Sequence, residues 1–170
     1  GVTPMLRVGR QAEAGSVRAM PANLDWAEAS AYSAAGMTAY VSLVHRAHLA
    51  AGETLLVHGA TGGTGLATVQ LGRHLGARVI ATGRSLDKLE AARALGAHAL
   101  VQIGPHMRDE VMRLTDGQGV DVVFDPIGGD VFDASLRCLA WGGRLLVIGF
   151  VGGRIADLKS NYVLIQGISV

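Results

Sequence analysis

A glycine-rich turn between a short apolar run and a helical pattern constrains this chain more than any other feature. The apolar run, residues 54–58, predicts a fully buried strand. The turn follows at 59–65 with the sequence Gly-Ala-Thr-Gly-Gly-Thr-Gly, and apolar residues then recur every fourth position from Ala67 to Leu75. That spacing puts them on one face of a helix. A second strand is predicted at 78–81, so the stretch indicates strand, glycine turn, helix, strand.

Such a unit is typical of dinucleotide binding, because the free N–H groups and the dipole at a helix N-terminus favour a pyrophosphate. Gly62 would let the backbone approach the phosphates, and Gly65 would let the helix pack closely on the strand. The pattern G-x-G-x-x-G is met only at its second and third glycines, since Ala60 occupies the first. An ordinary flexible turn is the alternative, but the flanking elements are the context that the motif requires. We therefore predict a cofactor site that includes Ala60, Thr61, Gly62, Gly63, Thr64 and Gly65.

Length and composition favour one compact α/β domain. The chain has 170 residues, of which 49% are hydrophobic, 17% are charged and 24 are glycine. The net charge is +1, and no block of like charge predicts a nucleic-acid or membrane surface. No apolar run is long enough to span a bilayer. The single Cys138 excludes an internal disulfide and fits a reducing cytoplasm.

The rest of the chain alternates between strand and helix patterns. Residues 1–23 are interrupted by proline and glycine and predict a lead-in from a preceding domain. A helical pattern begins at Asp25, a plausible N-cap, and we expect Gly36 to divide it into two helices. The fold class predicted is α/β, a doubly wound six-stranded parallel sheet of the Rossmann type. The six strands are expected at residues 54–58, 78–81, 99–102, 120–124, 144–148 and 163–168.

The choice of cofactor is decided after the second strand. An NAD site needs an acidic residue about 20 positions past the glycine turn, yet Thr82-Gly83-Arg84-Ser85 stands there without a carboxylate. Arg84 offers a planar donor fork for a 2′-phosphate, and Lys88 adds a second cation. Lys88 is also expected in the first turn of a helix, where the dipole disfavours a cation unless an anion binds. Two solvated surface cations are the alternative; we predict NADPH.

Five motifs recur together in one known family, and they cover about residues 21–170. The chain resembles the cofactor domain of zinc-independent medium-chain dehydrogenases/reductases, in particular the NADPH:quinone oxidoreductase (zeta-crystallin-like) branch. The joint spacing of the motifs is far more specific than any one of them. They are Gly36-Met37-Thr38-Ala39-Tyr40, the turn 59–65, Leu75-Gly76-Ala77-Arg78-Val79-Ile80, Gly119-Val120-Asp121-Val122-Val123 and Asp125-Pro126-Ile127-Gly128-Gly129.

The resemblance implies a fragment of a two-domain enzyme, in which a GroES-like catalytic domain precedes residues 1–170. It implies 2′-phosphate contacts at Ser85, the small polar residue, and at Lys88; Gly83 and Arg84 complete the predicted cofactor site there. It also implies nicotinamide contacts at Ile148, Gly149 and Phe150, and ribose contacts at Pro126, Ile127 and Gly128. Asp125 is as well suited to capping its own turn as to touching the cofactor. Thr38 is implied as a contact, with a hydroxyl bonded to its own helix as the alternative.

Catalytic residues and metal ligands are not predicted in this chain. His45 and His48 are three apart on a helix, but no cysteine or acidic cluster accompanies them. His58, at the end of the first strand, is expected to be a packed core histidine. Zinc-using relatives carry a cysteine just ahead of the Gly36 motif, whereas 30–33 here is Ser-Ala-Tyr-Ser, so no zinc is expected. Relatives also place a tyrosine after the third strand, where Gln102 stands.

The resulting hypothesis is an NADPH-binding domain for hydride transfer to a quinone or an α,β-unsaturated carbonyl, both small molecules. An enoyl reductase domain of a polyketide synthase is the alternative enzyme, and a non-catalytic, crystallin-like protein is the alternative of another class. The apolar segment 163–168 lacks proline and is expected to be an edge strand that pairs two copies into a homodimer.

Overall fold

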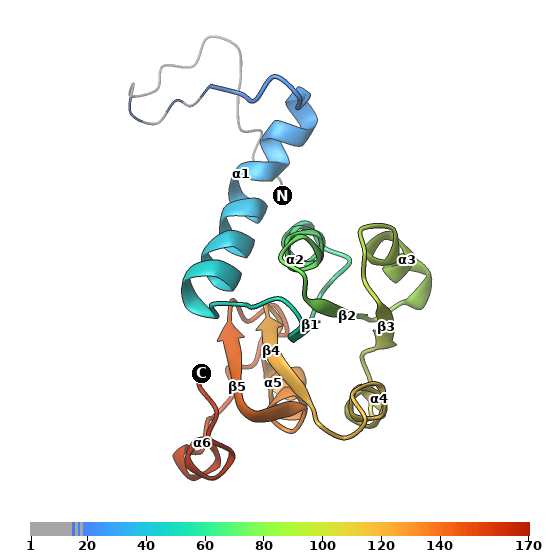
Figure 1. The fold of residues 1–170 in the computed structure, drawn as a ribbon, viewed down its shortest axis with the longest axis vertical. Coiled ribbons are helices and arrows are strands. Elements are labelled where there is room, and N and C mark those ends of the chain that lie inside the picture. Colours follow the sequence, from blue (N-terminus) through green and yellow to red (C-terminus); the bar gives the residue numbers. More distant parts are fainter. Residues whose placement is uncertain (1–14, 16, 18) are drawn as a thin grey trace.

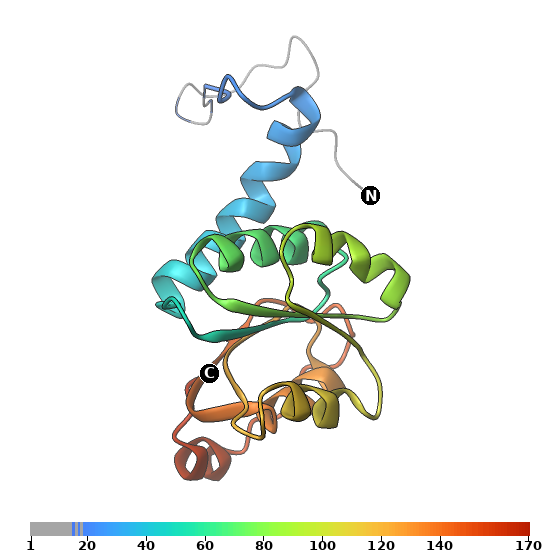
Figure 2. The same cartoon turned by 45° about the vertical axis from the view of Figure 1, so that its right-hand side comes forward.

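Five parallel strands form a twisted sheet in the order β3-β2-β1-β4-β5. The computed structural model describes residues 15, 17 and 19–170, so most of the predicted lead-in lies outside the described residues. Helices cover both faces, with α2 and α3 above the sheet and α4 and α5 below it in Figure 2. The predicted doubly wound Rossmann fold is therefore confirmed. The strands are β1 (Thr54–Val57), β2 (Arg78–Gly83), β3 (Ala99–Gln102), β4 (Val120–Asp125) and β5 (Leu139–Val147).

The helices follow the strands in alternation, as the fold requires for parallel pairing. Each face has its own apolar core: Val69 of α2 and Leu89 of α3 belong to one, and Val111 of α4 and Phe132 of α5 belong to the other. The inner strands β2, β1 and β4 are largely buried on both faces, which explains their apolar sequences. The helices are α2 (Gly63–His74), α3 (Leu86–Ala94), α4 (Met107–Leu114) and α5 (Gly129–Leu136), with α1 (Trp26–Tyr40) before the sheet and α6 (Ser160–Gln166) after it.

The first helix begins as predicted but does not break at Gly36. The Asp25 carboxylate accepts the Glu28 N–H at 2.7 Å, and the Glu28 carboxylate accepts the Asp25 N–H at 2.9 Å. Together the two bonds form a capping box. The helix then runs through Gly36 to Tyr40 and continues as a π-helical segment, Val41–Arg46. One glycine costs a helix about 1 kcal/mol, which does not end it without a turn signal beside it. The helix extends away from the sheet in Figure 1.

The predicted sixth strand is wrong, because residues 160–166 form helix α6. Gly167 ends this helix in the left-handed conformation, with φ of 60°. Leu164 and Ile165 are largely exposed, while Ile168 packs into the lower core. Past the helix the chain pairs with the sheet edge, through a parallel bridge between Ser169 and Arg144 of β5. The edge strand proposed for dimer formation is thus absent at 163–168.

Candidate cofactor site

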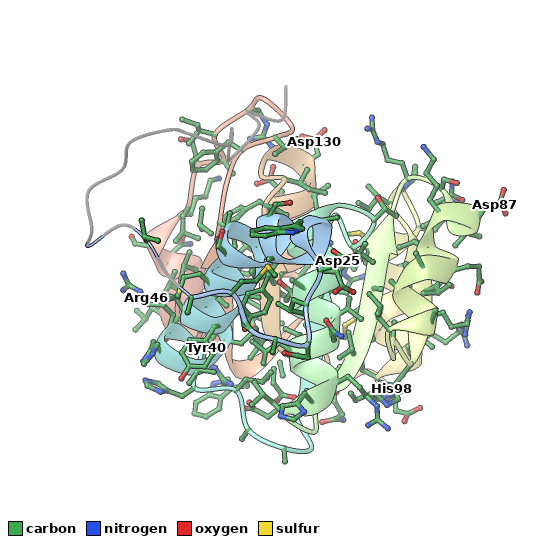
Figure 3. All side chains as sticks on the ribbon, turned by 90° about the horizontal axis from the view of Figure 1, so that it is seen from above. Asp25, Tyr40, Arg46, Asp87, His98 and Asp130 are labelled. Atoms are coloured by element: carbon green, nitrogen blue, oxygen red, sulfur yellow. The ribbon has the colours of Figure 1, made fainter. Side chains whose placement is uncertain are left out.

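The carboxyl ends of β2, β1, β4 and β5 meet along one edge of the sheet, and the predicted site residues gather there. The chain reverses its direction of winding between β1 and β4, which opens a crevice at that edge. Backbone bonds join the loops: Ala60 N–H donates to Thr82 O at 3.0 Å, and Ile148 N–H to Asp125 O at 2.9 Å. In Figure 3, Asp87 and Asp130, at the start of α3 and α5, lie along this edge, and His98 lies at the opposite one.

The glycine turn starts helix α2 and leaves its first N–H groups free. Gly62 is the N-cap, with an extended backbone and no side chain to cap the helix. Leu66 N–H is the first to find a helical acceptor, Gly62 O at 2.8 Å. The N–H groups of Gly63, Thr64 and Gly65 make no hydrogen bond to the described part of the chain. Three unpaired donors at a helix N-terminus are suited to an anion such as a phosphate.

The glycines of the turn differ in what they allow. A Cβ at Gly65 would lie 2.3 Å from Gly59 O, so the helix packs on the strand as closely as a glycine permits. A Cβ at Gly63 would meet nothing within 4 Å, and both Gly62 and Gly63 are exposed. Gly65 is therefore required for packing, and the surface at Gly63 has room for a ligand. These residues fit the pyrophosphate of a dinucleotide.

Two cationic side chains lie just past the end of β2, and the end of the strand itself carries no carboxylate. Arg84 follows the strand, and Lys88 lies in the first turn of α3; both are exposed. The Ser85 hydroxyl is the N-cap of α3 and lies 3.5 Å from Lys88 N. The Gln102 amide donates to Arg84 O at 3.0 Å, so this side chain holds the backbone of Arg84. A donor placed opposite a loop carbonyl gives no sequence signal, and the sequence reasoning missed it.

The loop after β4 packs against the loop after β5. Gly128 has φ of 73°, and a Cβ there would lie 3.2 Å from the Phe150 ring. Val151 N–H donates to Pro126 O at 3.1 Å. These contacts bring Pro126, Ile127 and Gly128 together with Ile148, Gly149 and Phe150. Their roles toward a nicotinamide or ribose stay predictions.

Asp125 is buried, and one of its oxygens holds the turn that follows. Oδ1 accepts the N–H groups of Ile127 at 2.8 Å and Gly128 at 3.0 Å, which is the capping role. Oδ2 is buried and has no partner among the described residues. Burial raises the pKa of this carboxyl, although the two backbone hydrogen bonds act in the opposite direction.

The Thr38 side chain forms no hydrogen bond with the residues at the carboxyl ends of the strands. Its hydroxyl donates to Ala34 O at 2.8 Å, within helix α1, so the alternative interpretation describes its hydrogen bond. A groove of about 460 Å³ lies nearby between α1 and α2, with Gly36, Tyr40, Gly63 and Leu66 among its walls. This groove is mostly apolar and contains neither Arg84 nor the loop after β4. The polar groups therefore place the candidate site at the strand ends rather than in the groove.

The remaining reactive residue types are enclosed. His58 is buried, as predicted, between Thr82 and Ser135. Cys138 is buried as well, and burial raises the pKa of its thiol to about 11, which makes it unreactive. Within the described residues, no group of three or more His, Cys, Asp or Glu could hold a metal ion. The same residues contain no helix long and apolar enough to cross a membrane.

A surface ion cluster at the loop after β5 also escaped the sequence reasoning. Arg154 Nη2 lies 2.9 Å from Asp130 Oδ1 and also binds Asp133 Oδ2, both on α5. The cluster ties the loop to the helix that begins at Gly129. Arg154 is 24 and 21 residues away from the two aspartates in sequence, so only the fold brings it to them.

Comparison with known proteins assigns this arrangement to a family. The family model of the zinc-binding dehydrogenases matches residues 63–170, and the chain belongs to this family. The chain is 38% identical over 152 residues to a quinone oxidoreductase-like protein 2 homolog of Nematostella vectensis, covering 88% of the chain. It spans 41% of that relative. The predicted resemblance to the quinone oxidoreductase branch is thereby confirmed, and the predicted absence of zinc stays a prediction.

Two further comparisons bear on cofactor and alternative function. A mycobacterial protein solved in complex with NADPH superposes with a TM-score of 0.83 at 30% identity, covering 88% of this chain and 47% of that one. The mycoketide-CoA synthase of Mycobacterium tuberculosis is 43% identical over 142 residues, covering 80% of this chain and 3% of the synthase. The first agrees with the predicted cofactor, and the second with the alternative of a synthase domain.

Proposed function

We propose that this chain is the NADPH-holding half of an oxidoreductase that transfers hydride to a quinone or an α,β-unsaturated carbonyl. The observation that carries the proposal is the set of donors at Gly63, Thr64 and Gly65, unpaired within the described residues, beside the exposed cations Arg84 and Lys88. The kinship with quinone oxidoreductase-like proteins supports the reaction class. When bound, NADPH supplies the hydride, and the chain needs no nucleophile or metal of its own.

Each part of the crevice has a proposed task. The turn at 62–65 accepts the pyrophosphate through backbone N–H groups, which add no side-chain bulk. Arg84 and Lys88 hold the 2′-phosphate, Arg84 with two parallel donors and Lys88 as a point charge. The loops at Pro126–Gly128 and Ile148–Phe150 orient the ribose and the nicotinamide ring by backbone contacts. Substrate is held from the other side, by residues outside this chain.

Cofactor selectivity tests the proposal directly. We expect NADPH to bind more tightly than NADH, and Arg84→Ala to weaken NADPH about 10-fold or more while NADH changes little, because each charge-assisted contact contributes about 1.5–3 kcal/mol. Fluorescence titration of both cofactors measures this. Arg93→Ala is the matched control, an exposed arginine later on α3 that pairs with Glu90 at 3.0 Å. Equal affinities for NADPH and NADH in the wild type would sink the proposal.

Turnover tests the second half of the proposal. The chain spans less than half of its relatives, so we expect it to bind NADPH without appreciable oxidation by a simple quinone or a simple enone. The decrease in NADPH absorbance measures the rate for both acceptors. A chain that turns over as fast as a full-length quinone oxidoreductase would show that the substrate side is already complete.

The polyketide synthase relative favours one alternative, an enoyl reductase domain. It uses the same crevice and the same cofactor, so the acceptor distinguishes the two. Preference of the longer protein for an enoyl thioester over a quinone would favour the synthase domain. The homodimer stays a prediction, but it no longer follows from an edge strand at 163–168, because that segment is largely helical. Light scattering would measure the oligomeric state. The cytoplasmic location also stays a prediction.

A further inference from the structure

Three polar side chains form a buried row beneath the candidate crevice, on neighbouring strands. Val57 is the Cα partner of Ala81 on β2 and of Phe124 on β4, so the next positions, Thr82, His58 and Asp125, stand side by side. Side chains alternate along strands, so all three point to the face that α5 covers. They are 0%, 0% and 1% exposed. Polar residues enclosed this completely need partners.

The His58 ring connects two of the surrounding elements. Nδ1 lies 2.7 Å from Thr82 Oγ1 on β2, and Nε2 lies 2.6 Å from Ser135 Oγ on α5. The Ser135 hydroxyl also lies 2.6 Å from Val131 O. No hydrogen bond joins His58 to Asp125 within the described part of the chain.

Hydrogen-bond bookkeeping selects one tautomer of the ring. If Nε2 carries the proton, it donates to Ser135, Ser135 donates to Val131 O, and Thr82 donates to Nδ1. If Nδ1 carried it, the Thr82 hydroxyl hydrogen would have no acceptor among the described contacts. Because an unpaired buried donor costs about 1–3 kcal/mol, the neutral Nε2–H form is favoured. Burial also lowers the pKa of His58, to about 3, so the ring stays neutral.

The residues next to this network are those of the proposed site. Thr82 precedes Gly83 and Arg84, at the 2′-phosphate end, and His58 precedes the turn that begins at Gly59. Ser135 lies on α5, whose N-terminus follows Gly128 at the nicotinamide end. We propose that His58 is a positioning residue that fixes the two ends of the cofactor crevice relative to the glycine turn. This inference rests on the proposed function, because it assigns a role in cofactor binding.

The two bonds of the ring can be cut separately, and the proposal predicts different results. Thr82→Val keeps the volume but removes the bond on the Arg84 side, and we expect NADPH affinity to fall about fivefold or more relative to NADH affinity. Ser135→Ala removes the bond on the α5 side, and we expect both affinities to fall by the same factor. The reason is that NADPH and NADH differ only at the 2′-phosphate end.

A matched control separates positioning from stability. Thr115→Val removes another buried hydroxyl, one that accepts Gly119 N–H at 3.1 Å in the loop before β4. We expect it to lower the free energy of unfolding without altering the NADPH to NADH affinity ratio. A Thr82→Val variant that weakens both cofactors equally would overturn the inference while leaving NADPH binding by the wild type, and hence the proposed function, intact.

The tautomer provides a test that needs no cofactor. In long-range proton–nitrogen NMR spectra of the ¹⁵N-labelled chain, we expect His58 to show the Nε2–H pattern, unchanged between pH 7.5 and pH 5.5. An Nδ1–H pattern, or protonation of the ring in that interval, would overturn the inference whatever the cofactor titrations give. Wild-type protein that binds neither cofactor would refute the proposed function and, with it, the positioning role.

Discussion

The two edges of the sheet use their polar groups in opposite ways. At the edge where strands begin, charges are paired within the chain. Arg144 Nη2 lies 2.6 Å from Glu53 Oε2, and the Asp121 carboxylate accepts Thr54 N–H at 2.7 Å. Burial alone would raise the pKa of Glu53, but the hydrogen bonds from Arg144 and Ala50 and the arginine charge lower it. These two carboxylates are therefore paired within the chain, whereas Arg144 Nε is buried without a partner among the described residues.

The edge where strands end leaves donors open. The N–H groups of 63–65 and the side chains of Arg84 and Lys88 have no hydrogen-bond partner in the described residues. Such groups contribute little to folding, and the proposed cofactor would pair with them. The comparison teaches that polar groups paired within the chain at one edge stabilise the fold, whereas donors left open at the other edge are free for the proposed ligand. Substitutions at the two edges should therefore have separable effects.

The largest effect is expected at the turn itself, for Gly65→Ala. The added Cβ would lie 2.3 Å from Gly59 O, a backbone atom that cannot move aside cheaply. We expect the free energy of unfolding to fall by about 3 kcal/mol in urea denaturation. Gly63→Ala is the control, because its Cβ enters open space and should leave stability nearly unchanged while weakening NADPH binding. Similar losses of stability for both variants would show that Gly63, like Gly65, is required for packing.

Glu53→Gln should affect only stability. The change removes a charge-assisted hydrogen bond to Arg144 at the edge where the strands begin. We expect the free energy of unfolding to fall by about 2 kcal/mol. NADPH affinity should stay within twofold of wild type, a margin of about 0.4 kcal/mol. Calorimetric titration at a temperature well below the unfolding transition checks this. A large loss of affinity would show that the two edges are coupled.

The pH dependence of stability should reveal His58. The pKa of its ring is about 3 in the folded chain, against an ordinary value of 6.5, so its contribution is present above 6.5 and is lost as the pH falls. From pH 7.5 to 5.5 this loss amounts to about 1.4 kcal/mol. Urea unfolding at both pH values should show a smaller decrease for His58→Gln than for wild type. The raised pKa of Asp125 acts with the opposite sign, but both proteins carry it.

The smallest effect is expected for Arg154→Gln. The arginine binds Asp130 and Asp133 on the surface, where water and salt screen the charges. We expect an unfolding midpoint that cannot be distinguished from wild type, at both low and high salt. A decrease larger than that of Glu53→Gln would mean that the loop after β5 carries more of the fold than its exposure suggests.

Sequence patterns predicted what depends on local periodicity and glycine chemistry. The strand at 99–102 has the predicted bounds, and the turn at 59–65 does lead from a buried strand into a helix. The prediction of a strand at 163–168 failed because a short apolar run does not distinguish strand from helix; the structure has a helix there, which ends at Gly167. The predicted break at Gly36 was wrong because a glycine weakens a helix without ending it.

Within the site, sequence identified residues next to the crevice but not those that hold them. Arg84 was predicted to contact the 2′-phosphate because no acidic residue stands at the end of the second strand. Gln102, which holds the Arg84 carbonyl, and Ser135, which holds His58, come from other elements, 18 and 77 residues away from their partners. No spacing rule connects such pairs. Only the register of the strands and the packing of α5 bring them together.

The open N–H groups of Gly63, Thr64 and Gly65 have a consequence for the bench. An apo protein with three unsatisfied donors at a helix end will accept small anions from its buffer, and an anion bound to the folded state alone raises apparent stability by mass action. Melting temperatures measured in phosphate or sulfate should therefore exceed those measured in a buffer of bulky organic anions, and cofactor affinities should be lower. The choice of buffer thus sets the baseline against which every variant of this crevice is compared.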